Sequence, residues 1–273
     1  MEFGKNVEKR AAAIGDNCID LYPGLHRYYC TGNAVDFAVH MQRLGIQTSL
    51  ISVTGNDQYG IQMRKELEEE KIDLSHFYTA EGQTAVSYME LVGKERTYGD
   101  YIEGVMENVE FSDEDIAFAG RHDLVHTAFW GNAQKYLPDI RRAGAEIVFD
   151  YATEKDDPLV EETIPYVSYA FFSFEKDGAD TRDFLQEIVK KGPAIAVATF
   201  GEEGSIAWDG ADFHSYGICK SSLVNTIGAG DSYIAGFMSG ILKGYSIEGC
   251  MAQGAKVAAE VVSTFGPWTK KEV

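Results

Sequence analysis

The chain has 273 residues, of which 45% are hydrophobic and 25% charged, a normal globular mixture that excludes an intrinsically disordered protein. Its 24 Lys and Arg residues against 43 Asp and Glu residues give a net charge of -19, which argues against binding to nucleic acids or to an anionic membrane surface. No stretch approaches the roughly 18 apolar residues of a membrane span, and the four cysteines form no CxxC pair, so we expect a cytoplasmic protein with free thiols and one large domain over residues 1–273.

The first part of the chain alternates between strand and helix patterns. Residues 11–15 (AAAIG) predict a strand, and residues 33–44 predict a helix because their apolar side chains recur at helical spacing. The run at 47–53, rich in Ile, Val and Leu, predicts a second strand. The charged segment 58–71 predicts a second helix with a solvated outer face.

Two segments interrupt this alternation. Residues 84–101 contain two runs of strand-forming residues around a glycine-containing turn at 92–94, which predicts a hairpin. Residues 25–30 (LHRYYC) are a short aromatic strand candidate. Together they predict a small sheet that projects from the main one, formed by about residues 22–31 and 80–104.

The alternation then resumes and defines the fold class. Strands are predicted at 124–127, 146–150, 168–173 and 195–199, helices at 133–143 and 181–191, a hairpin over 205–216, and two final helices at 229–242 and 247–264. Strands separated by helices favour a parallel sheet built from βαβ units, so the fold class is α/β.

A glycine-rich turn, NTIGAGDS at 225–232, precedes the helix at 229–242. Glycines at a helix N-terminus let backbone amides approach an anion, and the helix dipole adds partial positive charge there. Asp231 follows in the first turn, where a carboxylate beside an anion site can accept the proton of an attacking hydroxyl in phosphoryl transfer. On these residues alone, a turn with Asp231 as a simple charge partner of the helix remains an alternative.

Five segments, in order along the chain, resemble motifs of the PfkB/ribokinase family of carbohydrate kinases. They are IGDNCID (14–20), TGNAVD (31–36), TGNDQYG (54–60), TFGEEG (199–204) and TIGAGDS (226–232). The resemblance implies a ribokinase-like three-layer fold, with a mostly parallel central sheet flanked by helices and a small β-sheet lid that closes over the sugar.

The resemblance also implies roles for individual residues, with ATP as co-substrate. The positions that resemble the catalytic base and the anion hole are Asp231, Gly228, Ala229 and Gly230. Those that match sugar contacts are Asp20, Gly32, Asn33 and Asp36. Those that match nucleotide contacts are Thr199, Gly201, Gly204 and Thr226.

Three motifs depart from the family pattern. The first helix motif has Thr31 and Asp36 in place of Gly and Asn, and we expect Asp36 either to pair with a cationic group of the acceptor or to bond within the protein. Asn225 replaces an Asp beside a monovalent-cation site, which predicts little activation by potassium. The motif linked to magnesium has Phe172 in place of Asn but keeps Glu175, so we expect Mg²⁺ to travel mainly with the triphosphate, with Glu175 acting indirectly.

Local likenesses within the family suggest the acceptor. The segments that resemble the family's fructosamine kinases are GDNCIDLYP (15–23), GNAVDFAV (32–39), GDYIEGVM (99–106), SIAWDGADF (205–213) and MAQGAK (251–256). They imply phosphorylation of a fructosamine such as fructoselysine at O6. Because the lid forms a dimer contact in several members, the resemblance also allows a homodimer through the lid.

Other function classes stay open as alternatives. Another sugar kinase or a nucleoside kinase would carry the same motifs. A dinucleotide-dependent oxidoreductase would need G-x-G-x-x-G after the first strand, where the chain reads DNCIDLY. A non-catalytic ligand-binding relative is disfavoured by Asp231 beside an intact Gly-Ala-Gly.

Overall fold

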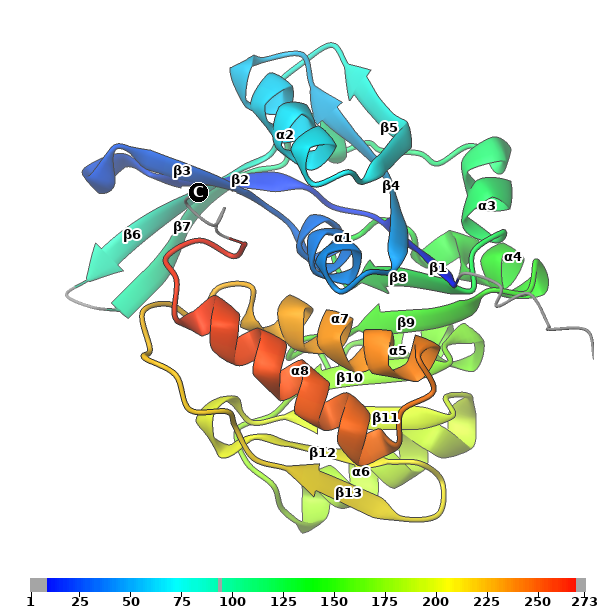
Figure 1. Cartoon of the computed structure of the whole chain (residues 1–273). Helices are drawn as coiled ribbons and strands as arrows, with labels where there is room; N and C mark the ends of the chain where they lie inside the picture. Colours follow the sequence, from blue (N-terminus) through cyan, green and yellow to red (C-terminus); the bar gives the residue numbers. More distant parts are fainter. Residues whose placement is uncertain (1–8, 93–94, 269–273) are drawn as a thin grey trace, which may run out of the picture.

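The computed structural model describes residues 9–92 and 95–268, and its larger sheet spans the molecule (Figure 1). The strands of this sheet are β1 (Arg10–Ile14), β4 (Gln47–Gly55), β5 (Asp73–Ala80), β8 (Leu124–Ala128), β9 (Glu146–Asp150), β10 (Tyr169–Ser173), β11 (Ile195–Thr199), β12 (Ser205–Trp208) and β13 (Phe213–Tyr216). Their order is β13-β12-β11-β10-β9-β8-β1-β4-β5. The strands from β11 to β5 are parallel, whereas β12 and β13 are antiparallel to their neighbours.

Helices cover both faces of the larger sheet (Figure 1). One face packs against α1 (Asn33–Arg43), α2 (Gln58–Glu69), α7 (Ala229–Leu242) and α8 (Ile247–Val262), and the other against α3 (Asp113–Ala119), α4 (Leu137–Arg142), α5 (Pro158–Thr163) and α6 (Ala179–Lys191). Successive side chains of a strand point to opposite faces, and β1 follows this rule. Ala11 and Ala13 lie in the core with α1 and α7, whereas Ala12 and Ile14 lie in the core with α3 and α4.

The carboxyl ends of the parallel strands meet at one edge of the sheet, which is where ligands bind in open α/β folds. The loops after β1 and β8 come very close there. A Cβ on Gly15 would lie 2.8 Å from Gly131 Cα, and Gly15 has a φ of 144°. Only glycine fits this position, and the close approach brings the residues after β1 next to the loop after β8.

A second, smaller sheet projects from this edge (Figure 1). Its strands are β2 (Cys18–Tyr22), β3 (Arg27–Thr31), β6 (Val86–Val92) and β7 (Glu95–Ile102), in the order β3-β2-β6-β7. Ile19 of β2 pairs with Val86 of β6, and both are buried in the core, so they anchor the small sheet to the main body.

The expected α/β architecture is present, namely a mostly parallel sheet, helices on both faces and a small separate sheet. Four elements, β2, β5, α3 and α5, were not expected, and the helix expected at 133–143 starts as a 3₁₀ turn (Gln134–Tyr136) before α4. The expected small-sheet region of 22–31 and 80–104 contains β3, β6 and β7 but omits most of β2. Residues 93 and 94 of the expected turn lie outside the described residues. Within the described ranges, no helix is long and apolar enough to cross a membrane.

Candidate active site

The N-terminus of α7 carries the predicted anion hole. Gly228 is its N-cap residue and has a φ of 73°, a left-handed conformation that favours glycine. Ala229 donates its backbone N–H to Thr226 O at 3.2 Å, which closes the turn before the helix. Beside Gly230, no heavy atom from outside its own helix turn lies within 4 Å of the place that a Cβ would occupy. This side of the helix N-terminus therefore has room for an anionic group.

Asp231 lies in the first turn of α7 and is only 9% exposed. Asn33 Nδ2 at the start of α1 donates to Asp231 Oδ1 at 2.8 Å. Burial raises the pKa of Asp231 to about 8, and the charges of Asp150 and Asp16 add to the rise, whereas the bond from Asn33 opposes it. A carboxyl with a pKa near neutrality is suited to act as a general base.

Asn33 connects Asp231 to Asp16, because its backbone N–H donates to Asp16 Oδ2 at 2.9 Å. The turn that permits this requires Gly32, which has a φ of 125° and whose Cβ would lie 2.7 Å from Asn17 Cα. Asp16 Oδ1 and Asn17 Oδ1 are buried and have no hydrogen-bond partner among the described residues. Burial also raises the pKa of Asp16. An unpaired buried carboxylate oxygen beside Asp231 is a position where a ligand can donate a hydrogen bond.

Asp150, at the carboxyl end of β9, is a third carboxyl in this group, and the sequence analysis did not single it out. Its Oδ1 accepts from Ala152 N at 2.9 Å. Burial raises its pKa to about 6, and the charge of Asp16 adds to the rise. The available signal was a carboxylate at the end of a predicted parallel strand, where functional groups gather.

The structure places Asp36 in an internal network. Its side chain is on α1 and the residue is 1% exposed. Thr31 Oγ1 donates to Asp36 Oδ2 at 2.8 Å, and Trp268 Nε1 donates to Asp36 Oδ1 at 2.9 Å. Burial and the charge of Asp231 raise the pKa of Asp36, while these two bonds oppose the rise. These contacts give both carboxyl oxygens of Asp36 a partner within the protein, and its contact with an acceptor stays a prediction.

Asp20 lies on β2 in the small sheet and is buried. It pairs in register with Ser87 of β6 on one side and with Tyr29 of β3 on the other. Its contact with a sugar stays a prediction.

Three of the four predicted nucleotide residues lie at and just after the carboxyl end of β11, and the fourth, Thr226, lies in the turn before α7. Thr199 ends β11, and Gly201 and Gly204 follow it. Gly204 has a φ of 94°, and its Cβ would lie 2.3 Å from Tyr216 O, so no other residue fits there. Thr226 is exposed in the turn before α7.

A cavity of about 230 Å³ opens beside this region, and it is lined by Asp177, Phe200, Glu203, Ser205, Ile206, Ser215, Tyr216 and Gly217. These include chain neighbours of Thr199, Gly201 and Gly204 but none of the four predicted nucleotide residues. Their contact with ATP stays a prediction.

Glu175 is exposed in the segment after β10, and Phe174 N donates to Thr199 O at 2.9 Å, which holds this segment beside the end of β11. Among the described residues, no group of three His, Cys, Asp or Glu side chains could hold a metal ion. The use of Mg²⁺, with Glu175 acting indirectly, stays a prediction.

Asn225 is buried in the turn before α7. Its Oδ1 accepts from Ile227 N at 3.1 Å, and its Nδ2 donates to Phe265 O. The side-chain amide therefore joins the turn to the segment after α8 through neutral hydrogen bonds.

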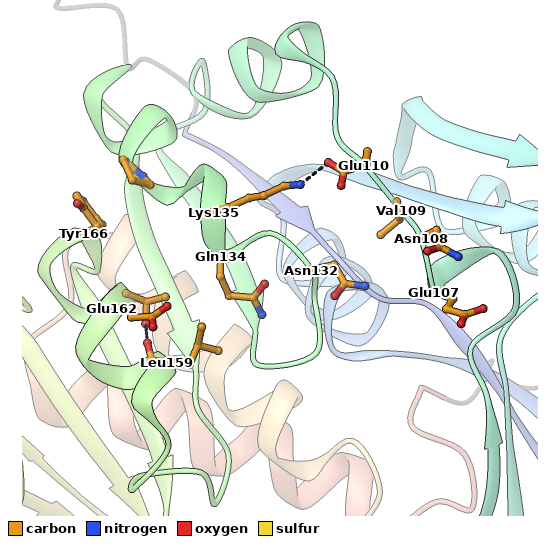
Figure 2. Close-up of a pocket in the computed structure, with 12 residues that line it drawn as sticks. Glu107, Asn108, Val109, Glu110, Asn132, Gln134, Lys135, Leu159, Glu162 and Tyr166 are labelled. Carbon is orange, nitrogen blue, oxygen red and sulfur yellow. Dashed lines mark hydrogen bonds and ion pairs between the residues drawn. The ribbon is translucent and has the colours of Figure 1, made fainter.

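A larger cavity of about 750 Å³ lies apart from this group (Figure 2). Figure 2 shows it between the segment 107–110 and α5, with Asn132 and Gln134 between them. It contains none of the predicted site residues. Lys135 reaches across one side to pair with Glu110, and the other charged side chains of the lining are Glu107 and Glu162.

Comparison with known proteins agrees with this geometry. The pfkB family carbohydrate kinase profile matches residues 25–272. The chain is 40% identical to fructoselysine 6-kinase of Shigella flexneri over 95% of this chain and 100% of that protein. It is 29% identical to a fructosamine kinase of Bacillus subtilis over 93% and 91% of the two chains.

Among solved structures, ribokinase of Arabidopsis thaliana with ribose and ATP has a TM-score of 0.83 at 16% identity, covering 94% of this chain and 93% of that one. Adenosine kinase of Sinorhizobium meliloti has a TM-score of 0.80 at 19% identity, covering 95% of each chain. At these identities the likeness establishes the shared ribokinase-like fold.

Proposed function

Since the chain belongs to the pfkB family of carbohydrate kinases, we propose that it transfers the γ-phosphoryl group of ATP to O6 of a fructosamine, with fructoselysine as the favoured acceptor. The observation that most supports the reaction is Asp231, a buried carboxyl with a raised pKa beside the open helix N-terminus at Gly230. The acceptor is supported by the full-length likeness to fructoselysine 6-kinase.

Asp231 accepts the proton of the attacking hydroxyl, and Asn33 Nδ2 fixes the carboxylate by binding Oδ1, which leaves Oδ2 for the acceptor. The amides at the N-terminus of α7 and the helix dipole stabilise the negative charge of the phosphoryl group. When bound with ATP, Mg²⁺ would neutralise charge on the phosphates, and Glu175 would influence the ion without binding it directly.

The charge of the site supports a cationic acceptor. The charge of Asp16 raises the pKa of Asp150, and the charges of Asp150 and Asp16 raise the pKa of Asp231, so a positive ligand beside them would relieve this repulsion. Asp16 Oδ1 has no partner within the described part of the chain, and a protonated secondary amine or a sugar hydroxyl could donate to it. A fructosamine offers both groups, whereas a free sugar or a nucleoside offers hydroxyls without the aliphatic amine.

The small sheet is proposed to act as a lid. It projects from the same edge of the main sheet (Figure 1). Its strand β2 carries Asp20 and begins just after Asp16 in the sequence. Closure over the acceptor would exclude water and so prevent hydrolysis of ATP. A homodimer through this sheet is proposed as well.

A coupled assay of ADP release tests the proposed acceptor. Purified protein with ATP and Mg²⁺ is offered fructoselysine, free fructose, ribose and adenosine, and the phosphorylated carbon is identified by NMR. We expect the highest kcat/KM with fructoselysine and phosphate on O6. A higher kcat/KM with adenosine or ribose would replace the fructosamine proposal with the nucleoside or free-sugar alternative, while phosphorylation at another carbon would refute the assignment to O6.

A further inference from the structure

The segment Phe265–Trp268, which follows α8, connects parts of the site that lie far apart in the sequence. Its carbonyl groups bind two of them, because Phe265 O accepts from Asn225 Nδ2 and Pro267 O lies 3.1 Å from His40 Nε2 of α1. The ring of Phe265 packs against Tyr29 of the small sheet at a centroid distance of 5.5 Å. The segment thus touches the anion-hole turn, helix α1 and the small sheet.

The same segment also forms a hydrogen bond with Asp36, through Trp268. Trp268 is buried, and its indole N–H donates to a carboxylate oxygen that is shielded from water. The other oxygen of Asp36 is held by Thr31. Hydrogen bonds to a charged or partly charged group are stronger than neutral ones, and leaving such a buried group unpaired is costly.

Asp36 and Pro267 together form the surface on which Gly228 rests. A Cβ on Gly228 would lie 2.8 Å from Pro267 Cβ and 3.3 Å from Asp36 Oδ2. Gly228 is the N-cap of α7, three residues before Asp231. Asp36 and Pro267 therefore bound the space in which the start of the helix that carries the anion hole can lie.

We propose that Asp36 and Trp268 are positioning residues for phosphoryl transfer, and that they act by holding Gly228 and the first amides of α7 in place. The proposal rests on the proposed kinase reaction and assigns Asp36 a role apart from acceptor binding. A displacement of about 1 Å in a catalytic group can cost up to a hundredfold in rate. Loss of the hydrogen bond between Trp268 and Asp36 should therefore lower kcat and leave the KM for the acceptor nearly unchanged.

The variant Trp268→Phe tests this directly, because it removes the indole donor and keeps an aromatic ring. We expect kcat at 25 °C to fall about tenfold, with the KM for the acceptor within about twofold of wild type. Trp208→Phe on β12, the same change at a residue outside this network, serves as the matched control and should leave both constants unchanged.

A second variant separates positioning from substrate contact. In Asp36→Asn, the amide oxygen can still accept from Trp268, and the amide NH₂ can face Thr31, whose hydroxyl can accept. We expect a smaller loss of kcat than in Trp268→Phe, because the acceptor for the indole N–H is retained.

Two results would overturn the proposal. One is a folded Trp268→Phe variant with wild-type kcat. The other is a loss in either variant that appears only as a raised KM for the acceptor, which would make Asp36 a binding residue. Both constants are measured with whichever acceptor the wild type phosphorylates, so a wrong acceptor assignment would show in the wild type before any variant is made.

Discussion

Asp231→Asn should make the protein more stable while it removes most of the activity. The carboxyl has a pKa of about 8 in the fold against an ordinary value of 3.8, so at pH 7 the fold holds it largely protonated, whereas the unfolded chain ionises it. At pH 7 the unfolded chain therefore gains free energy by ionising Asp231, which lowers the stability of the fold. Asparagine does not ionise, so the variant avoids this loss of stability.

The size of the gain follows from this difference. Between the ordinary pKa and pH 7 lie roughly three pH units, and at about 1.4 kcal/mol for each unit the upper limit is about 4 kcal/mol. Asparagine keeps the 2.8 Å contact with Asn33 only if its carbonyl oxygen faces that residue. We therefore expect a gain of about 1–3 kcal/mol in the free energy of unfolding at pH 7.

Urea unfolding at pH 8 and at pH 5 checks the reasoning. A group whose pKa is raised in the fold contributes stability below its ordinary pKa, and this contribution is lost as the pH rises through the raised value. The advantage of Asp231→Asn should therefore be largest at pH 8 and fall to roughly a third of that at pH 5. Asp183→Asn, an exposed position on α6, is the control and should show no such trend.

The same variant should lose about 10²- to 10⁴-fold in kcat with ATP binding retained, as expected for removal of a general base. A variant that is less stable than wild type at both pH values would refute the claim that the site strains this carboxyl. More than about a third of the wild-type kcat would refute its role as the base.

Three further predictions concern the surroundings of this group. Asp150→Asn should move the acidic limb of the kcat/KM profile to lower pH by roughly one unit, because the charge of Asp150 helps to raise the pKa of Asp231; an unmoved limb would show that Asp150 does not set the pKa of the base. Potassium should change activity little at fixed ionic strength compared with sodium or a large organic cation, because Asn225 already joins the turn to Phe265; activation of several-fold by potassium alone would contradict this. Sedimentation at micromolar concentration should show a dimer that pairs through the small sheet, and a strict monomer would exclude it.

Periodicity was sufficient to predict the strands of the main sheet other than β5. The apolar runs that form β1, β4 and β8 to β11 are buried between two helical layers. Strands that are buried on both faces are apolar along most of their length, so these runs could be recognised in the sequence. β2 was missed because it is only five residues long and Asp20 interrupts its apolar residues. β5 was missed for a similar reason, since it is an edge strand with exposed polar residues.

Sequence motifs identified the residues near the N-terminus of α7, but they did not predict which of these residues form hydrogen bonds with one another. The bond between Asn33 and Asp231 joins residues 198 positions apart, and that between Asp36 and Trp268 joins residues 232 positions apart. No local pattern encodes such pairs, because they arise only when α1, α7 and the segment after α8 pack together. For Asp36, the sequence therefore left two partners open, and the contact with Trp268 became visible only in the fold.

The acidity of the site has a consequence for the order of events in catalysis. Burial raises the pKa values of Asp16, Asp36, Asp150 and Asp231, and that of Asp231 reaches about 8, so near neutral pH Asp231 must give up a proton before it can act as the general base. ATP brings further negative charge, which raises these pKa values, whereas a cationic acceptor lowers them. A fructosamine should therefore lower the pKa of Asp231 when it binds and so prepare it for catalysis, and a neutral sugar should not.

The pH profile of kcat reports the pKa values of the enzyme–substrate complex, and that of kcat/KM reports those of the free enzyme. With a fructosamine, we expect the acidic limb of kcat to lie about one pH unit or more below that of kcat/KM, and with a neutral acceptor such as free fructose we expect no such separation. Equal separations for both acceptors would mean that the amine does not reach this group of carboxyls and that the acidity of the site serves another purpose.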